Sequence, residues 1–297
     1  MTSFIPPKRI LMGPGPSNVH PRVLEAMARP TIGHLDPKFI ELMDEIKELL
    51  KYAFQTKNEV TFAVSGPGSV GMETCLVNLV EPGTKVLVCI NGVFGGRMKS
   101  IVERCGAEAV VVNMPWGRAV DPQLFEDTLK KNQGINVCSF VHAETSTGAR
   151  TDIKTLTEIA HQHNCIVIAD TVTSLAGIPL LIDEWNIDVS YSGSQKCLSC
   201  PPGLSPVTFN ERAVEFIRKR KTPVQSWFMD LNLILELLEW KHKKSLSPYC
   251  TNKFTVRSSR ITIDFKRRRN RKFLEETQSE WRKTSSGIRK DWIESIC

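Results

Sequence analysis

Short apolar runs alternate with amphipathic, helix-like segments between about residue 58 and residue 218 of this 297-residue chain. The apolar runs are continuous and rich in β-branched residues, which is typical of strands buried on both faces. They lie at residues 60–64, 85–89, 109–112, 137–142, 165–170, 189–192 and 205–209. Helices are expected from about residue 70 to 79, after residue 92 to about residue 105, and over 122–131, 153–163 and 211–219. This alternation predicts an α/β fold with a mostly parallel sheet flanked by helices.

Two chemically informative side chains lie where apolar runs give way to small polar residues. Asp170 ends the run Ile166–Asp170, and Lys196 closes the stretch Tyr191–Lys196. Ligands of parallel sheets bind at the carboxyl ends of the strands. A lysine amine there can form a Schiff base with a carbonyl, and a neighbouring acid is the partner that a pyridinium nitrogen needs. Together they indicate pyridoxal phosphate, although each alone also fits a solvated loop lysine or a helix-capping aspartate.

Other polar segments follow the same strands, and each allows two interpretations. The turn Ser65–Ser69 precedes a helix, so its backbone N–H groups either hold a phosphate or form an ordinary tight turn. Phe94, in the glycine-rich segment 91–97, either stacks on a planar cofactor or packs in the core. The hydroxyls of Glu144–Gly148 either bond a ligand or form turns. The rigid Gly13–Asn18 loop either lines a substrate site or leads into a helix.

Composition narrows the class of protein. A hydrophobic content of 41% and a charged content of 24% are those of a globular domain, and no apolar run is long enough to span a bilayer. No signal peptide is visible, so we expect an intracellular protein. Cys197 and Cys200 have the spacing of half a zinc site, but nothing completes it, so no metal is expected. We interpret His142 as structural, because no nucleophile is paired with it.

The basic charge is concentrated after residue 237. Residues 238–297 hold sixteen Lys and Arg against seven Asp and Glu, whereas the rest of the chain has a balance of −2. Only residues 254–265 of this segment resemble a strand, so we expect a poorly ordered basic tail. No nucleic-acid motif accompanies the charge, so nucleic-acid binding is not expected. A shifted reading frame or a mis-joined exon would produce such a pattern, and a divergent tail with its own function is the alternative.

Taken in order, six motifs of this chain resemble the class V aminotransferases, most closely the alanine–glyoxylate (serine–pyruvate) aminotransferase family with its insect members. The motifs are Gly13–Asn18, Ser65–Gly68, Asn91–Gly95, Thr145–Gly148, Asp170–Ser174 and Ser192–Gly203. The resemblance runs from about Lys8 to Leu235. It implies the large domain of a fold-type I pyridoxal-phosphate transferase. We therefore expect an N-terminal arm at 1–20, a cofactor-binding large domain at 21–237, and an incomplete or absent small C-terminal domain.

The resemblance also implies roles for individual residues. Lys196 would bear pyridoxal 5'-phosphate as an internal aldimine and act as the catalytic residue. Asp170 would pair with the pyridine nitrogen, Val172 and Phe94 would cover the two ring faces, and Thr145 would bond near the ring oxygen. The cofactor phosphate would be held by Gly68, Ser69 and Gln195. The substrate carboxylate would be bordered by Gly15, Ser17 and Asn18.

The reaction implied is transfer of an amino group from alanine or serine to glyoxylate or pyruvate, carried out by a homodimer. Alternatives are 3-hydroxykynurenine transamination and a catalytically impaired, truncated remnant; a Schiff-base aldolase would need neither Asp170 nor a phosphate cradle. Two departures from the family bear on these alternatives. The phosphate loop carries Pro67 and Ser69 in place of a serine and a histidine, and no substrate-clamping arginine is recognisable after Leu238. The location implied is the peroxisome by resemblance, or the cytoplasm otherwise, because the final residues, 295–297, are not a peroxisomal address.

Overall fold

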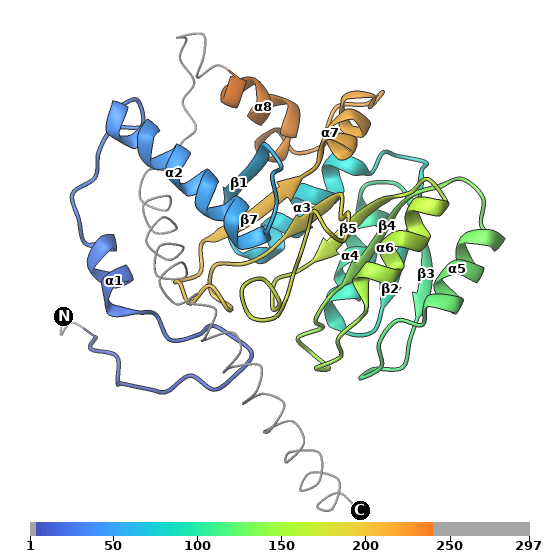
Figure 1. The fold of residues 1–297 in the computed structure, drawn as a ribbon, viewed down its shortest axis with the longest axis horizontal. Helices are drawn as coiled ribbons and strands as arrows, with labels where there is room; N and C mark the ends of the chain where they lie inside the picture. The colour runs from blue at the N-terminus through green and yellow to red at the C-terminus, as the bar shows by residue number, and fades with distance from the viewer. Residues whose placement is uncertain (1–3, 240–297) are drawn as a thin grey trace, which may run out of the picture.

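A seven-stranded sheet forms the centre of the computed structural model, which describes residues 4–239 (Figure 1). Its strands are β1 (Val60–Ser65), β2 (Lys85–Ile90), β3 (Glu108–Asn113), β4 (Ile135–Val141), β5 (Ile166–Asp170), β6 (Val189–Tyr191) and β7 (Leu204–Phe209). They lie in the order β1-β7-β6-β5-β4-β2-β3. All seven predicted strands are present, with ends displaced by at most two residues. The predicted fold class is confirmed.

Strand direction divides the sheet into two parts. Strands β6, β5, β4, β2 and β3 are parallel neighbours, whereas β7 runs antiparallel to both β6 and β1. The carboxyl ends of β4, β5 and β6 therefore meet at one edge, with Asp170 opposite Tyr191 in the register. A ligand site is expected at that edge of a parallel sheet.

Nine helices of the described chain surround the sheet or lie beside it. They are α1 (Pro21–Met27), α2 (Pro37–Phe54), α3 (Gly68–Leu79), α4 (Val93–Arg104), α5 (Pro122–Lys131), α6 (Ile153–Gln162), α7 (Glu211–Arg218), the 3₁₀ turn η1 (Trp227–Met229) and α8 (Leu231–Glu239). The predicted helices α3 to α7 are all present. Two helices near the N-terminus, α1 and α2, were not predicted, although Pro37 at the start of α2 follows the capping residue Asp36.

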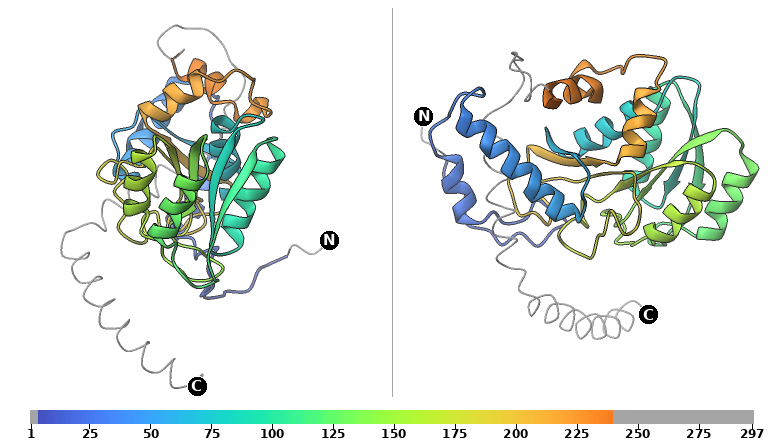
Figure 2. Two further views of the ribbon diagram at one scale, coloured as in Figure 1. Left: turned by 90° about the vertical axis from the view of Figure 1, so that its right-hand side faces the viewer. Right: turned by 45° about the horizontal axis from the view of Figure 1, so that its top comes forward.

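Alternate residues of strands β2 to β5 build two separate cores. Val86 and Val88 of β2 pack with α3, α4, α7 and α8, whereas Leu87 and Cys89 of the same strand pack with α5, α6 and the end of α2. Side chains of a strand point to opposite faces in turn, so both faces must be apolar when helices cover both. Figure 2 shows these helical layers on the two sides of the sheet. The continuous apolar runs in the sequence have this cause.

The N-terminal segment crosses the carboxyl edge of the sheet before α1 begins. Its backbone is held there by Ser17, whose N–H donates to the carbonyl of Gln195 at 2.9 Å. Within residues 4–239, no helix combines the length and the apolar character needed to cross a membrane. The predictions for residues 240–297, including the strand at 254–265, lie outside the described residues.

Candidate active site

A cavity of about 210 Å³ lies between the carboxyl ends of β5 and β6 and the first turns of α3 and α4. Asp170 lies in its wall, and Lys196 borders it from the loop that follows β6. Its lining is Pro67, Gly68, Ser69, Met72, Phe94, Arg97, Asp170, Val172, Gln195 and Lys196. Seven of the eight predicted cofactor residues are therefore gathered around one space, and Thr145 is the exception. These residues come from four separate segments of sequence.

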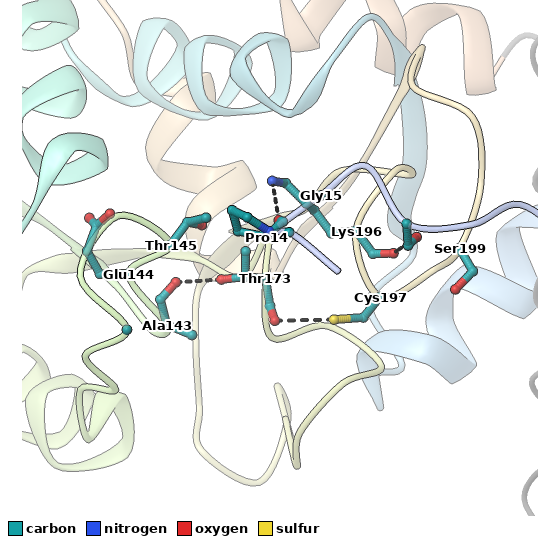
Figure 3. Close-up of a pocket in the computed structure, with 12 residues that line it drawn as sticks. Pro14, Gly15, Ala143, Glu144, Thr145, Thr173, Lys196, Cys197 and Ser199 are labelled. Carbon is teal, nitrogen blue, oxygen red and sulfur yellow. Dashed lines mark hydrogen bonds between the residues drawn. The ribbon is translucent and has the colours of Figure 1, made fainter. Parts of the chain in front are cut away.

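A second, more open pocket of about 400 Å³ adjoins the first, and Lys196 lines both. Thr145 lies here with two of the predicted substrate residues, Gly15 and Ser17 (Figure 3). Asn18 is not part of the lining. Its side chain instead accepts a hydrogen bond from the Leu11 N–H and donates to the Arg9 carbonyl, which closes the N-terminal loop on itself. A substrate role for Asn18 stays a prediction.

Asp170 is a buried acid with an unusual proton affinity. Burial raises its pKa to about 6, against hydrogen bonds from the Val172 N–H at 2.9 Å and the Tyr191 hydroxyl at 2.7 Å, which lower it. The nearby Glu144 carboxyl raises the same pKa, and the Arg97 guanidinium lowers it. A carboxylate taken out of water is most stable beside a positive charge. This position therefore favours a cationic N–H group in the cavity.

Lys196 is held by the N-terminal loop. Its Nζ donates to the carbonyl oxygen of Pro14 at 2.7 Å, as Figure 3 shows. A Cβ on Gly15 would lie 2.4 Å from Cδ of Lys196, and the φ of Gly15 is +118°. Ser17 completes the contact, because its hydroxyl donates to the Lys196 carbonyl at 2.7 Å. The glycine is thus required for the loop to approach the lysine this closely.

The first turn of α3 offers backbone donors to the cavity. Pro67 precedes the helix and provides no side-chain cap, so no side chain of that residue occupies the N–H groups of the first turn. Gly68 packs against Val172, since a Cβ on Gly68 would lie 3.2 Å from Val172 Cγ2. Beside it, the buried Oε1 of Gln195 has no hydrogen-bond partner within the described residues. An anionic ligand could accept hydrogen bonds from these N–H groups, whereas the Gln195 oxygen requires a donor.

Phe94 occupies the first turn of α4, and a distant acid fixes it there. The N–H of Phe94 donates to Glu144 Oε2 at 3.2 Å, and the N–H of Val93 donates to Ser146 Oγ at 3.0 Å. Glu144 is buried and also accepts from the N–H and hydroxyl of Ser146. The helix cap Gly92 has no side chain to perform this function. The loop after β4 therefore caps α4 and joins the walls of the two pockets.

Three residues of the site were not assigned from the sequence: Glu144, Tyr191 and Arg97. Glu144 begins the hydroxyl-rich segment, and Tyr191 begins the lysine stretch, but each was interpreted only as a flanking position. Arg97 closes the segment that carries Phe94, and its Nη1 donates to Ser69 Oγ at 2.8 Å. Its guanidinium carbon lies 4.9 Å from the centre of the Phe94 ring. A charge one turn into a helix that starts with a glycine-rich segment is the signal that would have identified it.

His142 lies outside both pocket linings, in the core near Trp185. It is 1% exposed, and burial lowers its pKa to about 4. It is therefore neutral at ordinary pH, as the structural interpretation requires. Cys197 donates to the Thr173 carbonyl, and no group of three metal-ligating side chains occurs in residues 4–239.

The comparisons with known proteins agree with this geometry. Residues 10–224 match the family model described as aminotransferase class-V. The chain belongs to the class-V aminotransferase family. The alanine–glyoxylate aminotransferase of Drosophila melanogaster is 44% identical over 229 residues, and that of Rattus norvegicus is 41% identical over 231 residues. These matches cover 77% and 78% of this chain. The expected family resemblance is confirmed.

Solved structures of the family share the fold. An alanine–glyoxylate aminotransferase from Nostoc superposes with a TM-score of 0.90 at 36% identity, covering 98% of this chain and 76% of that chain. The ureidoglycine–glyoxylate aminotransferase of Bacillus subtilis gives 0.87 at 31%, covering 97% and 74%. This class-V chain spans only 58% and 56% of the length of the two curated animal relatives.

Proposed function

We propose that this class-V chain is a pyridoxal-phosphate-dependent aminotransferase, with alanine or serine as amino donor and glyoxylate or pyruvate as acceptor. The observation that carries the proposal is the position of Asp170, at the end of β5, and Lys196, in the loop after the neighbouring strand β6, which line one cavity. The relatives from Drosophila melanogaster and Rattus norvegicus, both named alanine–glyoxylate aminotransferase, support the substrate class.

The residues present fit the cofactor. The buried Asp170 carboxyl suits a ring N–H, and the backbone N–H groups of the first turn of α3 suit an anionic ligand end. Phe94 and Val172 line the space between these ends. Bound pyridoxal phosphate supplies a carbonyl that takes up amino groups and a ring that withdraws electrons from the α-carbon of an amino acid.

The chain's own groups then have distinct tasks. Lys196 would provide the amine that holds the cofactor, and its Nζ, when free, would take up the proton lost from the substrate α-carbon. Asp170 keeps the ring nitrogen protonated by presenting a carboxylate where water cannot reach it. Tyr191 and the Val172 N–H orient that carboxylate. Thr145, Gly15 and Ser17 lie in the adjoining pocket, where the amino acid would enter.

The N-terminal loop must release Lys196 for this chemistry, because Nζ is bonded to the Pro14 carbonyl. That bond is solvent-exposed, so water can replace the Pro14 carbonyl as the partner of Nζ when the loop moves. The homodimer, the peroxisomal or cytoplasmic location and the domain limits at residues 20 and 237 stay predictions.

Absorbance spectra of the purified full chain with pyridoxal phosphate test the proposal. We expect a visible band that is lost in Lys196→Ala, a change in that band when alanine is added, and release of pyruvate in equal amount. Glyoxylate should then restore the first spectrum. A wild-type chain with no Lys196-dependent band would overturn the proposal. A band that alanine and serine leave unchanged would identify the catalytically impaired remnant, and a response to 3-hydroxykynurenine alone would favour that alternative.

A further inference from the structure

Positive charge is scarce around the smaller cavity. Among the described residues that line it, only Lys196 and Arg97 are cationic, and Asp170 is anionic. If Lys196 holds the cofactor carbonyl, its amine cannot also neutralise a phosphate at the other end of the same molecule. A phosphate carries close to two negative charges at neutral pH. The first turn of α3 offers only partial positive charge from its dipole.

Arg97 lies in the second turn of α4 and reaches the first turn of α3. Its Nη1 donates to Ser69 Oγ at 2.8 Å, across the gap between the two helices. Its guanidinium carbon lies 4.9 Å from the Phe94 ring centre, a distance at which a cation is attracted to the ring. These two contacts hold the guanidinium at the exposed rim of the cavity beside Ser69. One hydrogen bond uses only one of the five N–H donors of an arginine.

We propose that Arg97 is a cofactor-binding residue that contacts the phosphate group and makes the site selective for the phosphorylated form of its carbonyl cofactor. Arg97 supplies the full charge that the first turn of α3 lacks, and its planar fork matches two phosphate oxygens. Its position on Phe94 links the phosphate end to the wall of the ring site. The inference rests on the proposed function, since it requires pyridoxal phosphate as the ligand.

A comparison of pyridoxal phosphate with pyridoxal separates phosphate recognition from pocket integrity. Both aldehydes are titrated against the full-length wild type, Arg97→Gln and Arg97→Lys, and the dissociation constants are taken from the absorbance of the bound aldehyde. We expect Arg97→Gln to weaken pyridoxal phosphate about tenfold or more and pyridoxal less than about twofold, since a hydrogen bond to a charged group has this strength. Arg97→Lys keeps the charge but lacks the planar fork of donors, so its dissociation constant for pyridoxal phosphate should lie between those of the wild type and Arg97→Gln.

Lys99→Gln is the matched control. Lys99 lies two residues further along α4, pairs with Glu103 at 2.8 Å and does not line the cavity. The Lys99→Gln substitution removes one positive charge from α4, as Arg97→Gln does. It should leave the dissociation constants of pyridoxal phosphate and pyridoxal unchanged.

Three results would overturn the inference. Equal weakening of both aldehydes in Arg97→Gln would show that Arg97 only positions Phe94. Unchanged dissociation constants for both aldehydes in Arg97→Gln would place the phosphate away from Arg97. If Lys99→Gln weakened pyridoxal phosphate as much as Arg97→Gln does, the effect would come from the net charge of the helix and not from a contact with the phosphate. In each of these cases the wild type still shows its Lys196-dependent absorbance band with pyridoxal phosphate, so the proposed function is not contradicted. A wild type that binds neither aldehyde overturns the proposed function as well.

Discussion

The Tyr191 hydroxyl donates to the Asp170 carboxylate at 2.7 Å, between two side chains that are 0% and 2% exposed. The two residues are register partners at the ends of the parallel strands β6 and β5, and Tyr191 packs in the core beneath α3. Adjacent register partners point to the same face of a sheet, which is why the phenol and the carboxylate meet. This hydrogen bond favours the ionised carboxylate, against the desolvation that raises its pKa to about 6.

Tyr191→Phe should therefore raise the pH at which cofactor affinity is lost. In the wild type, Asp170 is ionised above about pH 6 and can pair with a ring N–H, whereas below that pH it holds its own proton. Loss of the phenol removes a stabilising bond to the charged form, so the pKa of Asp170 rises further, by about one unit. The measurement is the dissociation constant of pyridoxal phosphate from pH 5 to pH 8.5. If the midpoint pH is the same in Tyr191→Phe as in the wild type, the titration of Asp170 does not set the pH dependence of cofactor binding.

Asp170→Asn tests the cost of holding this acid in the cofactor-free protein. The folded pKa, about 6, lies above the ordinary value of 3.8, so the contribution of Asp170 to stability is complete below pH 3.8 and is lost as pH rises through 6. A shift of about two units corresponds to roughly 3 kcal/mol. We expect Asp170→Asn to be more stable than the wild type at pH 7.5, by up to about that amount, with a difference that vanishes near pH 4.

Urea unfolding of the two cofactor-free chains at pH 4, 5, 6 and 7.5 measures this difference. Glu45→Gln, which changes an exposed carboxyl on α2, should follow the wild type at each pH. A wild type as stable as Asp170→Asn at pH 7.5 would mean that Asp170 is ionised in the folded chain at no cost.

Gly15→Ala should disturb the contact between the N-terminal loop and Lys196. A Cβ at this position would lie 2.4 Å from Lys196 Cδ and 2.8 Å from its Nζ, on a backbone with a φ of +118°. Either the loop or the lysine must move, and the backbone conformation itself costs about 1 kcal/mol or more for a residue with a side chain. We expect a lower free energy of unfolding by about that amount, measured in urea. Gly13→Ala, where a Cβ meets nothing within 4 Å, should unfold as the wild type does.

The sequence predicted the parts of this fold that depend on local pattern. Strands such as β5 and helices such as α5 and α6 were placed because apolar side chains cover both faces of a parallel sheet and helices follow each strand. The antiparallel direction of β7 could not be predicted, because its partners β1 and β6 are set by contacts far apart in the chain. Helix α2 was missed even though Asp36 and Pro37 mark its start.

The candidate site shows the same division. Asp170 ends β5 and Lys196 follows β6, and the two were found as a pair from their positions after apolar runs. Glu144 and Arg97 were missed, because their importance lies in contacts across space. Glu144 caps a helix that begins about fifty residues earlier, and Arg97 reaches Ser69 on another helix. Such pairings appear only once the sheet has brought the segments together.

Gly92→Ala should damage the joint between the loop after β4 and the first turn of α4. The backbone of Gly92 is extended, with a φ of 170°, so alanine adopts it without strain. Its Cβ, however, would lie 2.4 Å from Glu144 Cγ and 2.5 Å from Ser146 Oγ. These side chains cap α4 through the N–H groups of Val93 and Phe94, and a lost cap costs about 1 kcal/mol. We expect a lower free energy of unfolding by about 1–2 kcal/mol and weaker cofactor binding, since Phe94 moves with the helix end.

Gly96→Ala is the matched control on the same helix. A Cβ there meets nothing within 4 Å, and alanine is favoured over glycine inside a helix by about 0.5–1 kcal/mol. The two variants should therefore change urea stability in opposite directions, although both add one methyl group to α4 or its cap. If Gly92→Ala proves as stable as Gly96→Ala and binds pyridoxal phosphate as the wild type does, then Glu144 does not hold Phe94 in place. Opposite signs, with cofactor affinity lost in Gly92→Ala alone, would establish the loop after β4 as the support of the aromatic wall.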